Sequence, residues 1–99
     1  MHNKIDFFQF DNLVKNKVPF LFLNSAESLT SRYDSLYQTH LQNYEVLCQP
    51  EAYTQEIEQK KLPKEFPIVM RCSDDHVSIK AATDLSEKGF INVYILSQS

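Results

Sequence analysis

The sequence predicts an α/β domain in which a mainly parallel sheet is covered by helices on both faces. Short apolar runs of strand length alternate with segments whose apolar residues recur at helical spacing. The run at residues 66–70 is continuously apolar, as strands buried on both faces are. Strands that alternate with helices form parallel sheets, because the crossover helices pack on the faces of the sheet.

The beginning of the chain predicts a strand, a helix and a second strand. Ile5 and Asp6 mark a short opening strand, and Asp6 or Gln9 is suited to cap the helix that follows. Residues 19–23 are fully apolar and end at the polar pair 24–25, which predicts a central strand. The apolar stripe of the intervening helix comprises Phe7, Phe10, Leu13 and Val14.

Residues 26–40 predict a second helix, which Ser25 or Ser28 could start. We expect the Tyr33/Tyr37 pair and the apolar cluster of the first helix to lie in the core. That cluster consists of Phe7, Phe8 and Phe10. One face of the second helix would carry Leu29, Tyr33, Leu36 and Tyr37.

The middle of the chain predicts a strand followed by a third helix. Residues 44–48 have the composition of a strand, and Pro50 bars its continuation. Residues 51–62 form a polar segment that predicts a helix with Tyr53 and Ile57 facing inward.

The final third predicts a strand, a short loop, a helix and a last strand. The strand ends near Cys72, and residues 73–76 are of types that favour turns and helix caps. One face of the next helix is marked by Ile79, Ala82 and Leu85. Gly89 stands where a helix C-cap glycine belongs, and residues 90–96 form the next strand. Cys72 is therefore expected at the carboxyl edge of the sheet, where ligands gather in open α/β folds.

Composition narrows the class of protein. Ninety-nine residues suffice for one domain spanning 1–99, and 42% apolar residues suffice for a core without metal or disulfide support. A net charge of −3 without a basic run argues against a nucleic-acid surface. No apolar stretch reaches the length of a membrane span or of a secretory signal. Cys48 and Cys72 favour reduced thiols in a cytoplasmic protein.

Residues 67–96 resemble the rhodanese family. Residues 66–72 are similar to the strand that leads into that family's active-site cysteine, which places Cys72 at the cysteine position. Residues 81–96 match the following helix, Lys-Gly-Phe turn and strand in residue type and spacing over sixteen positions. The resemblance implies a single rhodanese-like domain and transfer of sulfane sulfur through a persulfide on Cys72.

The departures from the family pattern concern the site. Asp75 stands at the loop glycine position and Val77 at the position of the basic or hydroxyl residue. The family's Asp-x-Arg after the second strand is replaced by residues 24–26, which carry no charge. Residues 97–99 replace the customary Gly-Gly, and the family's terminal helix is expected to be missing. These changes argue against efficient turnover of thiosulfate, an anion that needs positive partners.

The resemblance assigns catalysis to Cys72, whose thiolate would be the nucleophile. The carboxylates of Asp74 and Asp75 oppose a nearby anion. His76 and Arg71 could offset them, although Arg71 alternates with Cys72 along the strand and is placed to face away. Backbone amides of the loop and the positive end of the following helix would stabilise the sulfur anion. The substrate-binding residues would be Ser73, Asp74, Asp75, His76, Val77 and Ser78.

Structural interpretations of the same residues remain open. Cys72 also fits a small buried hydrophobe that ends a strand. The polar residues 74–78 fit helix capping and first-turn charge, with His76 merely exposed. Cys48 is either a core thiol or a partner of Cys72 at the same sheet edge. No metal or cofactor is expected, because the paired spacing of a zinc motif is absent. Phosphatase chemistry is excluded, because no arginine lies between Cys72 and Ser78 to bind phosphate.

Three functions follow from these residues. The first is a rhodanese-like sulfurtransferase or sulfane-sulfur carrier that exchanges sulfur on Cys72 with a protein or a small persulfide, with weak thiosulfate activity. The alternative is a catalytically degenerate rhodanese module that acts in protein binding or regulation. A third is a redox sensor that uses Cys72 and Cys48.

Overall fold

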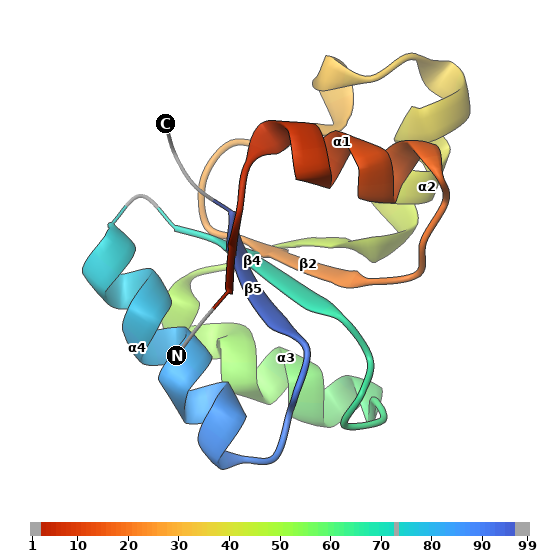
Figure 1. The fold of residues 1–99 in the computed structure, drawn as a ribbon. Helices are drawn as coiled ribbons and strands as arrows, with labels where there is room; N and C mark the ends of the chain where they lie inside the picture. The colour runs from red at the N-terminus through yellow and green to blue at the C-terminus, as the bar shows by residue number, and fades with distance from the viewer. Residues whose placement is uncertain (1–2, 73, 97–99) are drawn as a thin grey trace.

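The computed structural model describes residues 3–72 and 74–96. Its strands pair in the order β1-β5-β4-β2-β3, and all four pairings are parallel within the described residues. The strands are β1 (Asn3–Ile5), β2 (Leu21–Asn24), β3 (Glu45–Leu47), β4 (Ile68–Arg71) and β5 (Val93–Leu96). The α-helices are α1 (Phe7–Lys15), α2 (Ser35–Tyr44), α3 (Tyr53–Lys60) and α4 (Asp75–Glu87). The first two cover one face of the sheet and the last two the other (Figure 1). The predicted fold class is confirmed, and it is consistent with a rhodanese-like fold.

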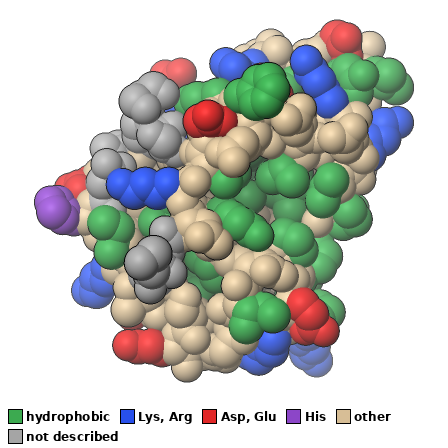
Figure 2. Space-filling view, viewed as in Figure 1, with side chains coloured by type: hydrophobic (Ala, Val, Ile, Leu, Met, Phe, Trp, Pro, Cys, Tyr) green, Lys and Arg blue, Asp and Glu red, His purple; other side chains and the backbone are tan. Residues whose placement is uncertain are grey.

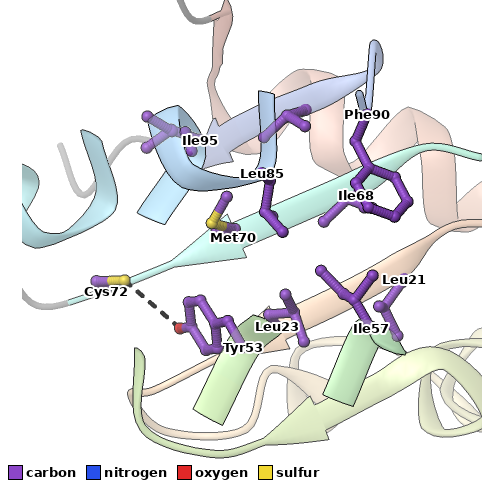
Figure 3. Packing of buried hydrophobic residues seen from close by; sticks show 12 residues of the cluster. Leu21, Leu23, Tyr53, Ile57, Ile68, Met70, Cys72, Leu85, Phe90 and Ile95 are labelled. Atoms are coloured by element: carbon purple, nitrogen blue, oxygen red, sulfur yellow. Dashed lines mark hydrogen bonds between the residues drawn. The ribbon is translucent and has the colours of Figure 1, made fainter. Parts of the chain in front are cut away.

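The core is divided by the sheet into two clusters. Successive residues of a strand point to opposite faces, so the three apolar residues that begin β2 and the three that begin β4 supply both clusters. On the side of α1 and α2 the cluster includes Phe10, Phe20, Phe22, Leu41 and Val69. On the side of α3 and α4 it includes Leu23, Tyr53, Ile57, Met70, Cys72 and Leu85 (Figure 3). The candidate thiol therefore belongs to the cluster beneath α3 and α4.

Helix α1 begins with a complete capping box. Oδ1 of Asp6 accepts from the backbone N–H of Gln9 at 2.8 Å, and Oε1 of Gln9 accepts from the N–H of Asp6 at 3.0 Å. Two N–H groups that the helix leaves without partners are thereby satisfied. The predicted start of this helix is confirmed, and both named residues take part.

Helix α4 ends in the conformation that its sequence predicts. Gly89 has a φ of +98°, in the region that favours glycine. The N–H of Gly89 donates to Ser86 O at 3.0 Å, and the N–H of Phe90 donates to Leu85 O at 3.2 Å. These two bonds form a Schellman motif, which turns the chain directly into the approach to β5.

The helix predicted over residues 26–40 is wrong over residues 26–34 and confirmed over residues 35–40. A short 3₁₀ turn, η1 (Thr30–Arg32), occupies the middle of this segment, and α2 begins only at Ser35 after Asp34. Side-chain hydrogen bonds hold residues 24–29 in a non-helical path, as described below. Helix α2 also runs through Tyr44, which was predicted to open the next strand, so β3 starts one residue later.

Three apolar side chains predicted to be internal lie on the surface. Phe8 is 74% exposed, Leu36 60% and Ile79 40%. In α4 the inward positions are Ser78, Ala82 and Leu85, which share one helical face as i, i+4 and i+7. Figure 2 shows hydrophobic side chains across the middle of the viewed face, among polar and charged ones. The buried face of α4 therefore includes Ser78, whereas Ile79 lies outside it.

The third helix is close to its prediction. A 3₁₀ turn, η2 (Pro50–Ala52), precedes α3, and both predicted inward residues, Tyr53 and Ile57, are buried. Among the described residues, no helix has the length and apolar character needed to cross a membrane. The predicted replacement of the family's Gly-Gly falls on residues 97–99, which lie outside the described residues.

Candidate functional site

Cys72 lies immediately after β4, at the carboxyl edge of the sheet. Its side chain is 2% exposed and packs in the cluster beneath α3 and α4. Helix α4 starts three residues later, so Cys72 stands between the end of an interior strand and the beginning of a helix. This is the position that the sequence predicts.

Three neighbouring strands bring Cys48, Ser25 and Cys72 to corresponding positions. The N–H of Ser25 donates to Arg71 O at 2.9 Å, and the N–H of Cys48 donates to Asn24 O at 3.1 Å. These bonds continue the registers of β2 with β4 and of β2 with β3 past the strand ends. The two thiols therefore share one sheet edge, as predicted, with the chain of β2 between them.

Tyr53 contributes a hydroxyl group to this edge. It is 1% exposed, and its hydroxyl oxygen lies 3.5 Å from Sγ of Cys72 (Figure 3). The same oxygen lies 3.2 Å from Arg71 O. Burial, and next its hydrogen bond with Cys72, raises the pKa of Tyr53. The sequence predicts the inward direction of this side chain but carries no signal for the contact at its tip.

The segment predicted as a loop of the persulfide site is mostly helical. Asp74 is the N-cap of α4, and residues 75–78 form the first turn, so only Ser73 and Asp74 separate Cys72 from the helix. Ser73 lies outside the described residues. Oδ1 of Asp74 accepts from the N–H of His76 at 2.8 Å, and Asp74 O accepts from the N–H of Ser78 at 3.1 Å. The capping interpretation of Asp74 is confirmed.

The side chains of this first turn diverge. His76 and Val77 are exposed, whereas Ser78 is buried on the inward face of α4. The amides of His76 and Ser78 are engaged by Asp74, so these two amides are not available to bind an anion. The N-terminus of α4, which carries a partial positive charge, begins four residues after the last residue of β4.

Arg71 faces away from Cys72, as its alternation along the strand predicts. Its Nη1 donates to Glu27 O at 2.8 Å, on the connection after β2. The guanidinium group therefore holds that connection in place and does not offer a positive charge to the sulfur.

Asn24 and Glu45 hold the connection after β2. Nδ2 of the fully buried Asn24 donates to Glu27 O at 2.8 Å and to Oε2 of Glu45 at 3.2 Å. The same carboxylate accepts from the N–H of Leu29 at 3.0 Å and from Oγ of Ser28 at 2.6 Å. These bonds account for the path that replaces the predicted helix, because they satisfy backbone groups outside a helix.

Cys48 differs from Cys72 in its surroundings. It is partly exposed and lines a hollow of about 160 Å³ with Asn24, Ser25, Ala26, Leu47 and Gln49. Burial raises the pKa of the Cys48 thiol to about 11, and the charges of Glu56 and Cys72 act in the same direction. Within the described residues, no group of three His, Cys, Asp or Glu side chains could hold a metal ion.

No family model matches this chain, and no curated protein matches it. Two solved structures are similar to it. One is the Alr3790 protein from Anabaena sp., with a TM-score of 0.67 and 16% identity over 96% of this chain and 80% of that one. The likeness establishes the fold. The other is an EanB variant in complex with ergothioneine covalently linked with a persulfide cysteine, with a TM-score of 0.67 and 13% identity. It is matched over 99% of this chain and 25% of its own length.

We predict that Cys48 and Cys72 do not form a disulfide in the folded protein. Two positions separated by an intervening strand lie about 9–10 Å apart, because neighbouring strands are about 4.8 Å apart. A disulfide needs Cα atoms within about 7 Å. Intact-mass measurement after diamide treatment should therefore show no loss of two hydrogen atoms in the native protein. The same treatment in urea should give that loss, and its appearance under native conditions would contradict the prediction.

Proposed function

We propose that this protein is a rhodanese-like sulfane-sulfur carrier in which Cys72 holds the sulfur as a persulfide. The observation that carries the proposal is the placement of Cys72 between the carboxyl end of β4 and the N-terminus of α4, with a hydroxyl group 3.5 Å from its Sγ. A structural neighbour with a persulfide cysteine supports a function related to sulfur transfer.

The transfer step is an exchange between two sulfur–sulfur bonds. The Cys72 thiolate attacks the outer sulfur of a small persulfide or protein persulfide, R–S–SH. The S–S bond of the donor breaks, R–S⁻ leaves with the electron pair, and Cys72–S–SH forms. The reverse exchange with an acceptor thiolate releases the sulfur, so the cycle needs no external oxidant or cofactor.

The alternative, a degenerate module that binds a partner, is supported by two observations. Arg71 is engaged with Glu27 on the far face, and Asp74 caps the helix that would otherwise present its amides to an anion. Both features weaken binding of thiosulfate, which carries two negative charges. These two features are weaker evidence against a persulfide donor, because its reacting group R–S–SH does not carry the two negative charges of thiosulfate.

Sulfur uptake by Cys72 tests the proposal. We expect the reduced protein to gain the mass of one sulfur atom after incubation with glutathione persulfide, with the modification mapped to the Cys72 peptide. Cys72→Ser should gain none, whereas Cys48→Ser should gain one, since Cys48 is not required for uptake. Absence of uptake by the wild type, or equal uptake by Cys72→Ser, would favour the binding module.

A further inference from the structure

Three hydrogen-bond donors converge on one backbone oxygen beside Cys72. Arg71 O accepts from the N–H of Ser25 at 2.9 Å and lies 3.1 Å from Oγ of Ser25. The hydroxyl oxygen of Tyr53 lies 3.2 Å from the same atom. A carbonyl oxygen has two lone pairs, so it cannot fully satisfy three donors.

Tyr53 has a second acceptor within reach. Its hydroxyl oxygen is 3.5 Å from Sγ of Cys72, and either atom can act as the donor (Figure 3). The Ser25 N–H and hydroxyl group donate to Arg71 O, and a hydrogen bond from the same hydroxyl group to the Tyr53 oxygen opposes the rise that burial causes in the Tyr53 pKa. Both arrangements leave the Tyr53 proton for the sulfur. A thiolate is the stronger acceptor, because hydrogen bonds to charged groups exceed those between neutral groups.

We propose that Tyr53 is a hydrogen-bond donor that stabilises the Cys72 thiolate, with Ser25 directing the Tyr53 proton to the sulfur. This inference deepens the proposed function, on which its biological meaning rests. It assigns to a tyrosine of α3 and a serine after β2 the stabilisation that neither Arg71 nor the amides of His76 and Ser78 supply.

The position of the hydroxyl group determines which step it assists. It contacts Sγ, the atom that carries the negative charge before sulfur uptake and again after sulfur release. In the persulfide the charge moves to the outer sulfur, one bond farther from the contact. Tyr53 therefore favours the thiolate as the attacking group and as the leaving group. Because burial raises the pKa of Tyr53, its hydroxyl keeps the proton through the neutral range.

The pH dependence of Cys72 alkylation tests this assignment. Iodoacetamide rates would be measured from pH 5 to 10 in a Cys48→Ser background, so that only Cys72 reports. Tyr53→Phe keeps the ring and removes the hydroxyl group. We expect the pH of half-maximal rate to rise by about one unit, with a loss of rate of about threefold below it. The rate at the high-pH plateau should not fall, because a thiolate of higher pKa is the stronger nucleophile.

A purely structural role of Tyr53 gives a different result. Loosened packing would raise the alkylation rate by the same factor at every pH, without moving the midpoint. Tyr33→Phe is the matched control, because Tyr33 is a buried tyrosine on the other face of the sheet whose hydroxyl donates to Asp11. It should leave the midpoint of Cys72 unchanged.

Ser25→Ala provides an independent test should Tyr53→Phe fold poorly. Loss of the Ser25 hydroxyl group vacates one lone pair of Arg71 O, to which Tyr53 would then turn. The midpoint should rise in the same direction as in Tyr53→Phe, by a smaller amount. Midpoints equal to the wild type in both variants would overturn the assignment, whatever the sulfur-uptake experiment shows. Shifted midpoints without sulfur uptake would instead reject the carrier function alone.

Discussion

Replacing Phe22 with alanine should lower the free energy of unfolding by about 3–5 kcal/mol, the usual cost of removing a buried phenylalanine. Phe22 is fully buried in β2, and its ring centroid lies 4.8 Å from that of Phe10 and 6.5 Å from that of Phe20. The substitution leaves a cavity that an interior strand cannot collapse to fill. A domain of this length is stabilised by roughly 5–15 kcal/mol in total, so the loss is a large fraction of it.

Urea denaturation followed by circular dichroism would measure this loss. Phe8→Ala is the matched control, because Phe8 is 74% exposed on α1. Its truncation therefore removes little buried apolar surface and leaves no cavity. The control should unfold near the wild-type midpoint. A midpoint for Phe22→Ala as high as that of Phe8→Ala would mean that the β2 face does not form the described core.

Glu45→Ala should cost about 3 kcal/mol of unfolding free energy, because hydrogen bonds to a charged acceptor contribute about 1.5–3 kcal/mol each and part of this is recovered by water. The Glu45 carboxylate accepts from Asn24, Ser28 and Leu29. Without it, the buried amide of Asn24 retains only its bond to Glu27 O as a donor. We also expect the connection after β2 to become the first site of proteolysis.

Chemical denaturation and limited proteolysis with peptide mapping would measure both effects. Glu58→Ala is the control of the same type, because Glu58 forms a single ion pair of 3.8 Å with Lys88 at an exposed site. It should change neither stability nor the cleavage pattern, since isolated surface ion pairs contribute little. Identical cleavage patterns for Glu45→Ala and the wild type would contradict the proposed role of the carboxylate.

The elements defined by local signals could be predicted from the sequence. The capping box at Asp6 and Gln9 and the glycine at 89 act on backbone groups within a few residues, so their chemistry is visible in a short window. The helix predicted over 26–40 failed over residues 26–34 for the opposite reason. Its decisive contact comes from Glu45, a residue of another strand whose side chain binds residues 24–29.

The site was predictable in position but not in composition. Alternation of strands and helices places Cys72 at the carboxyl edge of the sheet, and the alternation along β4 turns Arg71 away. The sequence pattern could not distinguish a six-residue loop from an early helix start, because Asp74 is equally suited to a loop and to a helix N-cap. The hydroxyl of Tyr53 reaches Cys72 through the packing of α3 on the sheet, a contact between residues 19 positions apart in the chain.

The pairing of β1 with β5 has a consequence for the order of folding. Asn3 pairs with Tyr94, so this register closes a loop of about 90 residues, whereas β4, α4 and β5 are joined by short connections. Contacts that close long loops form late, because the entropy of the intervening chain must be lost first. We therefore expect the half that contains Cys72 to assemble before β1 joins it. During synthesis, β1 must wait as an unpaired strand until residue 96 has emerged.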